Sequence, residues 1–136
     1  MHDDTQVAQR PLKRADGKML EAISSEIVSL QSQFFGKGPT KARTTWAGPD
    51  VLVCLMGGGF TPVEKTLYNS GRVDAVMQMR RAFQEAMEGR LRDVVEGVTG
   101  RHVVAFMSAN HQEPDLIAEI FVFEPETDDP DSPLHG

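Results

Sequence analysis

The sequence predicts an α+β fold in which a four-stranded antiparallel sheet carries helices packed on one face. Three observations support this class: a long helical stripe of apolar residues, two segments with the pattern of a β-hairpin, and well-marked helix boundaries between the hairpins. The expected order is α-β-β-α-α-β-β. The elements follow along the chain as one helix, a hairpin, two helices and a second hairpin.

The first helix is expected from Lys18 to Phe35. Its apolar residues recur at steps of three and four, which places them on one side of a helix. These residues are Leu20, Ile23, Ile27, Leu30 and Phe34. Gly36 follows directly and is typical of a helix C-terminus. The helix therefore has one stripe to bury against a sheet or a partner helix.

Two hairpins are expected on either side of the central helices. Residues 41–47 alternate between polar and less polar side chains, and after a turn at 47–50 the segment Val51–Met56 is apolar on both faces. Residues 102–109 and 116–123 are rich in Val, Ile and Phe and form the second hairpin. The strands Val51–Met56 and Leu116–Phe123 are apolar on both sides. If helices cover one face of the sheet, a homodimer is the simplest cover for the other.

Clear local signals mark the two central helices. Thr61-Pro62-Val63-Glu64 is a capping box with proline at the first helical position, so a short helix should begin there and end at Gly71. A longer helix follows and ends at Gly100. Three glycines, residues 57–59, precede the capping box. They suit a structural turn, although a helix N-terminus can also attract an anion.

Length and charge indicate one domain with two polar ends. The chain has 136 residues, which is the size of a single domain. Residues 1–16 and 125–136 are expected to be disordered, and residues 17–124 to form the domain. The C-terminal end is acidic and has no Lys or Arg, while residues 17–123 carry a net charge of −1 from 11 basic and 12 acidic side chains. Such a chain does not favour nucleic-acid binding.

The sequence also bears on location. No stretch approaches the ~18 apolar residues of a membrane span, and the N-terminus has no apolar core of a signal peptide. The single cysteine, Cys54, excludes an intramolecular disulfide and lies in the middle of an apolar strand. We therefore expect a cytoplasmic protein that reaches a membrane only through a partner.

Three cations make residues 37–43 a candidate anion site. Lys37, Lys41 and Arg43 flank flexible backbone and could hold bicarbonate, phosphate or a nucleotide phosphate. No Walker pattern accompanies them. The alternative is a helix end followed by an edge strand, where lysines discourage pairing with other strands.

Two further residues are candidates for a ligand site. His111 lies in a loop with Glu113 and Asp115, which could bind a metal, but no second local His or Cys gives a zinc spacing, and a polar surface turn is the alternative. Arg80 falls within the apolar stripe of the long helix, so it must be paired, lie at an interface or face a ligand. Glu119 is the matching exception in an apolar strand, and the two could pair. We expect no metal and no cofactor.

Several blocks of sequence together resemble one family. They are FGKGPTKA at residues 35–42, GGFTPVEKTL at residues 58–67, and TGR at 99–101 followed by VAFMS at 104–108. This ordered set is similar to the MpsC family of small bacterial proteins, named after a sodium-translocating, membrane-potential-generating system. The resemblance covers residues 18–125. It implies a soluble accessory component linked to membrane machinery for cation or inorganic-carbon uptake, and it brings no catalytic residues.

Two functions remain in competition at this point. The first is a non-enzymatic accessory or regulatory protein, dimeric, that binds a membrane complex through protein contacts. The second is a sensor for a small anion or nucleotide that uses Lys37, Lys41 and Arg43, with Arg80 or His111 lining a dimer cleft. No nucleophile–base pair or pair of catalytic carboxylates is recognisable in the sequence, so we do not expect an enzyme.

Overall fold

The computed structural model describes residues 14–36, 38–59, 61–126 and 130–135. The expected fold class and element order are confirmed. The elements, in chain order, are α2 (Arg14–Phe35), β1 (Lys41–Trp46), β2 (Val51–Gly57), α3 (Pro62–Asn69), α4 (Val73–Thr99), β3 (Val103–His111), β4 (Leu116–Phe123) and the 3₁₀ turn η1 (Pro133–His135). Helix α2 begins at Arg14, four residues before the expected start. Most of the segment predicted to be disordered, residues 1–13, lies outside the described residues.

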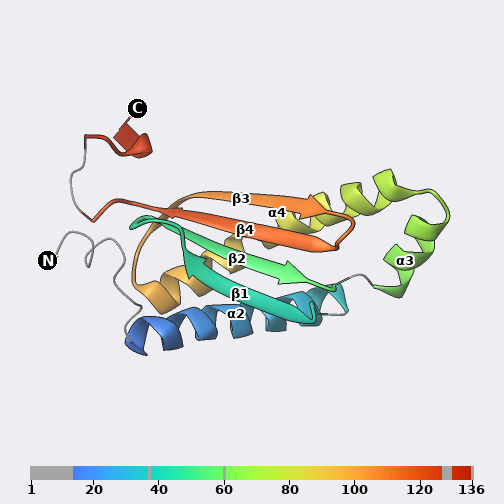
Figure 1. The fold of residues 1–136 in the computed structure, drawn as a ribbon, viewed down its shortest axis with the longest axis horizontal. Helices are drawn as coiled ribbons and strands as arrows, with labels where there is room; N and C mark the ends of the chain where they lie inside the picture. The colour runs from blue at the N-terminus through green and yellow to red at the C-terminus, as the bar shows by residue number, and fades with distance from the viewer. Residues whose placement is uncertain (1–13, 37, 60, 127–129, 136) are drawn as a thin grey trace, which may run out of the picture.

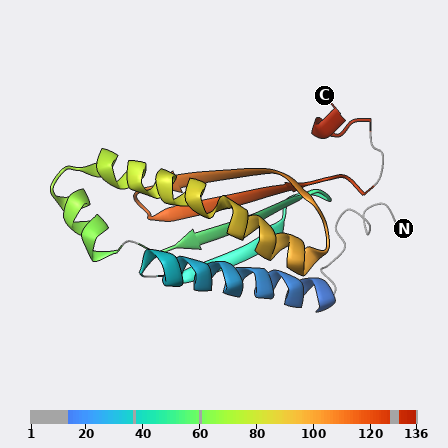
Figure 2. The ribbon, with the colours of Figure 1, turned by 180° about the vertical axis from the view of Figure 1, so that it is seen from behind.

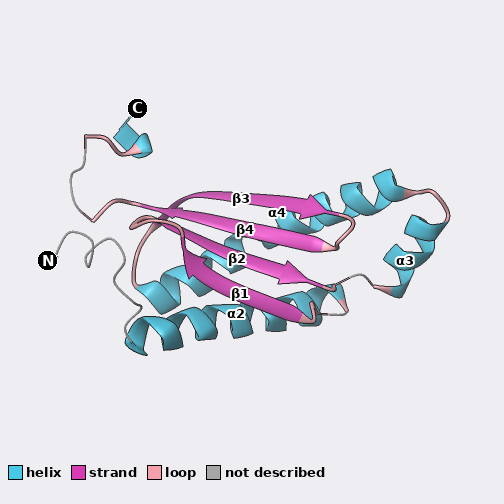
Figure 3. Ribbon diagram, in the orientation of Figure 1, coloured by secondary structure: helices cyan, strands magenta, loops and turns pink. Residues whose placement is uncertain are grey.

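The four strands form one antiparallel sheet in the order β1-β2-β4-β3. Each hairpin pairs its own strands, and β2 joins β4 at the centre of the sheet. Helices α2 and α4 pack side by side on one face, with α2 under β1 and α4 under β3. Figure 1 looks onto the opposite face of the sheet, and Figure 2 shows the same molecule from the helical side. Helix α3 lies beyond one end of the sheet (Figure 3).

The hydrophobic core fills the space between the sheet and the two long helices. The strands contribute every second residue, because successive side chains point to opposite faces. Fully buried core residues include Leu52, Met56, Phe121 and Phe123 from the strands and Ile23, Ile27, Leu91 and Val95 from the helices. Cys54 is buried among them, as expected. Burial, the largest effect, raises the pKa of its thiol, so Cys54 remains a neutral core residue.

The predicted boundaries of α3 and α4 are confirmed in atomic detail. The Thr61 side chain accepts a hydrogen bond from the Glu64 backbone N–H at 3.2 Å, and the Glu64 side chain accepts one from the Thr61 N–H at 2.9 Å. This is the capping box that the sequence predicts. Gly100 ends α4 with a left-handed backbone at φ 71°. Gly58 has φ 75° and lies against Thr40, so a side chain there would be strained and crowded.

Candidate functional site

The helix-free face of the sheet, here called the open face, is almost entirely apolar. Register and alternation assign to it ten residues: Val51, Val53 and Leu55 from β2, Leu116, Ala118, Ile120 and Val122 from β4, and Ala105, Met107 and Ala109 from β3. Leu55 and Met107 are 46% and 51% exposed, which is unusual for large apolar side chains. No described helix covers this face (Figure 1).

Polar side chains are confined to the two edges of the open face. On β1, Lys41 and Arg43 are exposed and alternate with the helix-facing residues, so they belong to the open face. On β3, His111 is exposed at the other edge, in the same row of the sheet as Lys41. Three strand spacings separate these residues, about 14 Å in all. The two central strands, β2 and β4, present only apolar side chains and Gly57 on this face.

The predicted ligand residues are therefore not gathered in one place within a single chain. Lys41 and Arg43 line a hollow of about 590 Å³ along β1 together with Leu55 and Leu116. Lys37 lies outside the described residues. The ring Nδ1 of His111 lies 2.8 Å from the Pro114 carbonyl oxygen, a contact within its own loop. Within the described ranges, no three His, Cys, Asp or Glu side chains gather closely enough to hold a metal ion.

Arg80 is buried, as its place in the apolar stripe predicts, and it is paired with two carboxylates. Its Nε donates to Glu64 at 2.8 Å and its Nη1 to Asp115 at 2.8 Å. Burial lowers the pKa of the guanidinium, but the bonds to Glu64 and Asp115 outweigh that effect and its pKa lies above the usual value. The sequence allowed Glu119 as a partner, and the structure gives Glu64 and Asp115. Arg80 instead ties α3 and the β3–β4 loop to α4.

Glu119 is also fully buried, and its hydrogen bond is to a hydroxyl group. It lies directly opposite Ser108 in the β3–β4 register, and the Ser108 hydroxyl donates to its Oε2. Among the described residues, no hydrogen bond of normal geometry reaches its Oε1. Burial raises the pKa of Glu119 to about 7, against smaller opposing effects of Ser108 and Gln84. The carboxyl group therefore changes protonation near neutral pH.

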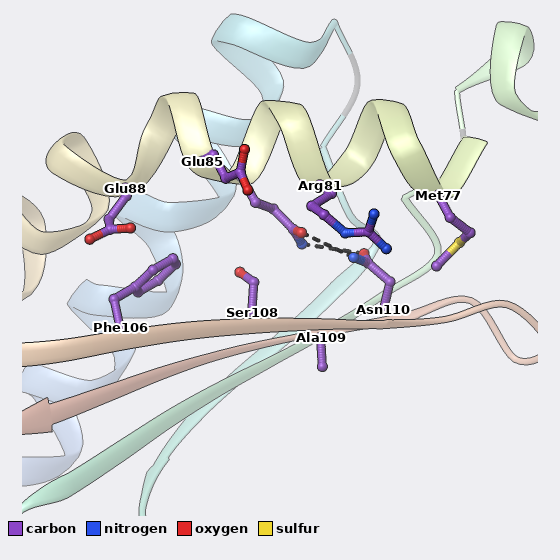
Figure 4. Close-up of a pocket in the computed structure, with 9 residues that line it drawn as sticks. Met77, Arg81, Glu85, Glu88, Phe106, Ser108, Ala109 and Asn110 are labelled. Atoms are coloured by element: carbon purple, nitrogen blue, oxygen red, sulfur yellow. Dashed lines mark hydrogen bonds between the residues drawn. The ribbon is translucent and has the colours of Figure 1, made fainter. Parts of the chain in front are cut away.

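A pocket of about 450 Å³ lies between α4 and β3, beside Ser108 (Figure 4). Gln84 and Asn110 bridge it with two amide hydrogen bonds of 3.0 and 3.3 Å. This group of residues was not predicted from the sequence. Gln84 carried a usable signal, since it follows Arg80 by one helical turn within the apolar stripe of α4. Ser108 and Asn110 gave none, because polar residues are ordinary in an edge strand.

Most of the chain matches the sequence profile of a known protein family. The profile of the family described as Na⁺-translocating membrane potential-generating system (MpsC) matches residues 15–125. The chain belongs to the MpsC family. The matched region runs from α2 through the end of β4, so the family domain includes both hairpins and both long helices. Searches of curated proteins and of solved structures gave no match.

The MpsC family description names a membrane system, so the helices were tested for membrane-spanning character. In the described part of this MpsC chain, none of the helices combines the length and the apolar character needed to cross a bilayer. Helix α4 is the longest, with 27 residues, and it carries charged side chains along its exposed side.

Proposed function

We propose that this MpsC protein is a soluble, non-enzymatic accessory or regulatory protein of a membrane system and that it is a homodimer. In the proposed dimer, two copies cover each other's open face. The observation that carries the proposal is that face, where ten apolar residues of three adjacent strands form one surface. The family description supports the link to a membrane system, and the absence of a spanning helix among the described residues suits a component that binds other chains.

The size and charge of the open face support self-association. The three strands that carry its apolar residues lie about 4.8 Å apart, and about seven residues in each, rising about 3.3 Å per residue, give a flat area of roughly 330 Å². Contiguous apolar patches of that size on a monomer are often functional. A two-fold axis near the centre of the sheet would bring the apolar residues of one open face against those of the other. Lys41 and Arg43 would then stay near the rim, in contact with water.

The homodimer is tested by measuring the solution mass of the purified full chain by light scattering over a range of concentrations. We expect a mass of twice 15.0 kDa at micromolar concentration. A mass of 15.0 kDa up to the highest soluble concentration would contradict the proposed dimer.

The accessory role needs a separate test with membrane extract from the source cells. The tagged full chain should recover one specific set of membrane proteins, and the recovery should not depend on the choice of mild detergent. Failure to recover any membrane protein in several detergents would argue against this role, whatever the mass of the protein in solution.

A small-anion or nucleotide sensor is the second candidate, favoured by one observation. Lys41 and Arg43 line the same hollow along β1, next to the apolar rows of the open face. The test is the melting temperature in phosphate, bicarbonate and nucleotide solutions. A ligand at about 100 times its Kd should add about 2.7 kcal/mol of stability. If this site is used, the double variant Lys41→Gln, Arg43→Gln should lose the shift.

A further inference from the structure

The pocket between α4 and β3 is a separate feature from the open face. It opens at the edge of the sheet, because β3 is an edge strand, and it extends inward between the helix and the strand. Figure 4 shows the side chains of α4 above it and those of β3 below it. Its volume of about 450 Å³ lies within the range of small-molecule sites.

The walls of the pocket combine apolar ends with a polar middle. Phe106 lies toward one end and Met77 toward the other, with Ser108 and Asn110 between them (Figure 4). Gln84 is hydrogen-bonded to Asn110. The reciprocal bond uses one donor of each amide, and the Gln84 amide also interacts with Glu119, while both amide oxygens retain the capacity to accept a second hydrogen bond. These groups can fix the orientation of a small polar molecule.

The buried carboxyl group of Glu119 lies next to Ser108 and Gln84 in the middle of the pocket wall. Glu119 touches both Ser108 and Gln84, which line the pocket, and its Oε1 is buried without a hydrogen bond of normal geometry from any described residue. A buried carboxylate is costly unless a donor or a cation compensates it. Because Ser108 and Gln84 line the pocket, a group bound between them can complete the unpaired oxygen.

The charged groups of the surrounding elements do not supply that compensation. On β2, the partner of Glu119 in the register is Cys54, whose proximity to the carboxylate raises the pKa of the thiol further. On α4, Arg80 is bound to Glu64 and Asp115. Arg81 is exposed at the pocket mouth, on the same helical surface as the carboxylates of Glu85 and Glu88.

We propose that this pocket binds a small organic ammonium ion whose charge is compensated by Glu119. The ammonium group would enter between Ser108 and Gln84 and donate to their oxygens and to the carboxylate. Its apolar part would lie against Phe106, whose ring face also attracts cations. A bare metal ion is a poorer fit, because the pocket is much larger than an ion and no cluster of metal ligands occurs in the described chain.

The test is a titration of the ¹⁵N-labelled full chain with n-butylammonium chloride, followed by two-dimensional NMR. We expect saturable shifts at the amides of residues 106–110 and at the side-chain amide of Gln84. Sodium chloride at equal ionic strength and 1-butanol at equal concentration are the comparison ligands. If sodium chloride gives the same shifts, the site is for an alkali ion. If butanol does, the pocket binds only the apolar part, and either result overturns the proposal.

Two variants test the role of Glu119 itself. Glu119→Gln keeps the shape of the side chain but removes its charge, and we expect at least a tenfold loss of affinity for butylammonium. Glu26→Gln removes an exposed carboxylate from α2, away from the pocket, and should change the affinity less than twofold. Equal affinity of wild type and Glu119→Gln would overturn the proposal.

The pH dependence gives a readout that needs no variant. The pKa of Glu119 is about 7, so only about one molecule in eleven carries the charge at pH 6, against about ten in eleven at pH 8. Butylammonium is charged at both values. Its affinity should fall about tenfold between pH 8 and pH 6, and saturating ligand should lower the pKa measured from the ¹³C signal of the Glu119 carboxyl. An unchanged pKa with ligand bound would overturn the proposal even if Glu119→Gln does not fold.

Discussion

The two faces of the sheet use the same four strands in opposite ways. The helix-covered face contains the apolar core and the buried Glu119, and helix α4, which packs over it, supplies the buried Arg80 and Gln84. The open face has apolar side chains on the central strands β2 and β4, and its polar side chains lie only on the edge strands. Alternation along each strand produces both surfaces from one sequence.

This contrast separates two properties of the molecule. A polar group on the covered face is enclosed, so removing its partner leaves a charge or a dipole without solvent and lowers the stability of the fold. A side chain on the open face contacts water in the monomer, so changing it has little effect on folding. Its effect should appear in association with another chain. The predictions below test this division, beginning with the largest expected effect.

Arg80→Met should have the largest effect on stability. The substitution leaves the carboxylates of Glu64 and Asp115 without their shared cation, and removing one member of a buried ion pair costs about 3–5 kcal/mol. Urea unfolding measures the free energy. The control is Arg81→Met, its exposed neighbour on α4, which should change the free energy by less than about 0.5 kcal/mol. Equal effects of the two substitutions would contradict the assigned network.

The network also shows how far sequence reasoning extends. Periodicity and capping signals were sufficient for the element order, the capping box at Thr61 and the burial of Arg80, because these depend on residues close together in the chain. The sequence left the partner of Arg80 open, with Glu119 as one possibility, and the structure gives Glu64 and Asp115. The partners of Arg80 depend on where α3 folds back against α4. This packing brings Arg80 next to Glu64, which lies 16 residues earlier in the chain, and next to Asp115, which lies 35 residues later.

The pocket beside Glu119 could not be predicted for the same reason. Its walls come from α4 and β3, and the position of one over the other depends on how the helix packs on the sheet. The open face was predictable in outline, since β2 and β4 are apolar on both sides. Lys41 and Arg43 were correctly expected on a strand, whereas His111 was expected in a loop and is the last residue of β3. Their separation across the sheet follows from the strand order.

The second prediction concerns the pH dependence of stability. The pKa of Glu119 is about 7 in the fold against about 4.5 in the unfolded chain, so the folded state binds more protons between these values. Stability is therefore greatest below pH 4.5 as far as this group is concerned, and it falls as the pH rises towards 7. Between pH 4.5 and pH values above 7, this group lowers the free energy of unfolding by roughly 3 kcal/mol.

This contribution is measured as the difference between wild type and Glu119→Gln in urea unfolding at several pH values. The difference should change with pH between 4.5 and 7 and then level off above pH 7. Other titrating groups affect both proteins alike, so the subtraction removes them. A difference that stays constant from pH 4.5 to 8 would show that the pKa of Glu119 is ordinary.

The third prediction concerns the cap of α3. Thr61→Ala removes the acceptor for the Glu64 N–H and should cost about 1 kcal/mol. Glu64 still pairs with Arg80, so the loss should be smaller than for Arg80→Met. Thr66→Ala, an exposed residue of the same helix, is the matched control and should change the stability by less than about 0.5 kcal/mol. A loss for Thr61→Ala as large as that for Arg80→Met would mean that the cap and the ion pair act as one unit.

The fourth prediction has the smallest effect on the fold. As a monomer, Leu55→Asp should keep the same folded structure, because Leu55 is 46% exposed and lies outside the core. Its amide spectrum and far-ultraviolet circular dichroism should match those of the wild type. Loss of the folded signal would show that the open face contributes to folding rather than to association.

The most direct test of the account is the solution mass of wild type, Leu55→Asp and Val63→Asp, measured side by side. Val63 is 62% exposed on α3, outside the open face, and it supplies a matched exposed apolar residue. The account predicts a mass of twice 15.0 kDa for the wild type and for Val63→Asp, and 15.0 kDa for Leu55→Asp. A dimer that persists in Leu55→Asp, or a monomeric wild type, would contradict the claim that two copies cover each other's open face.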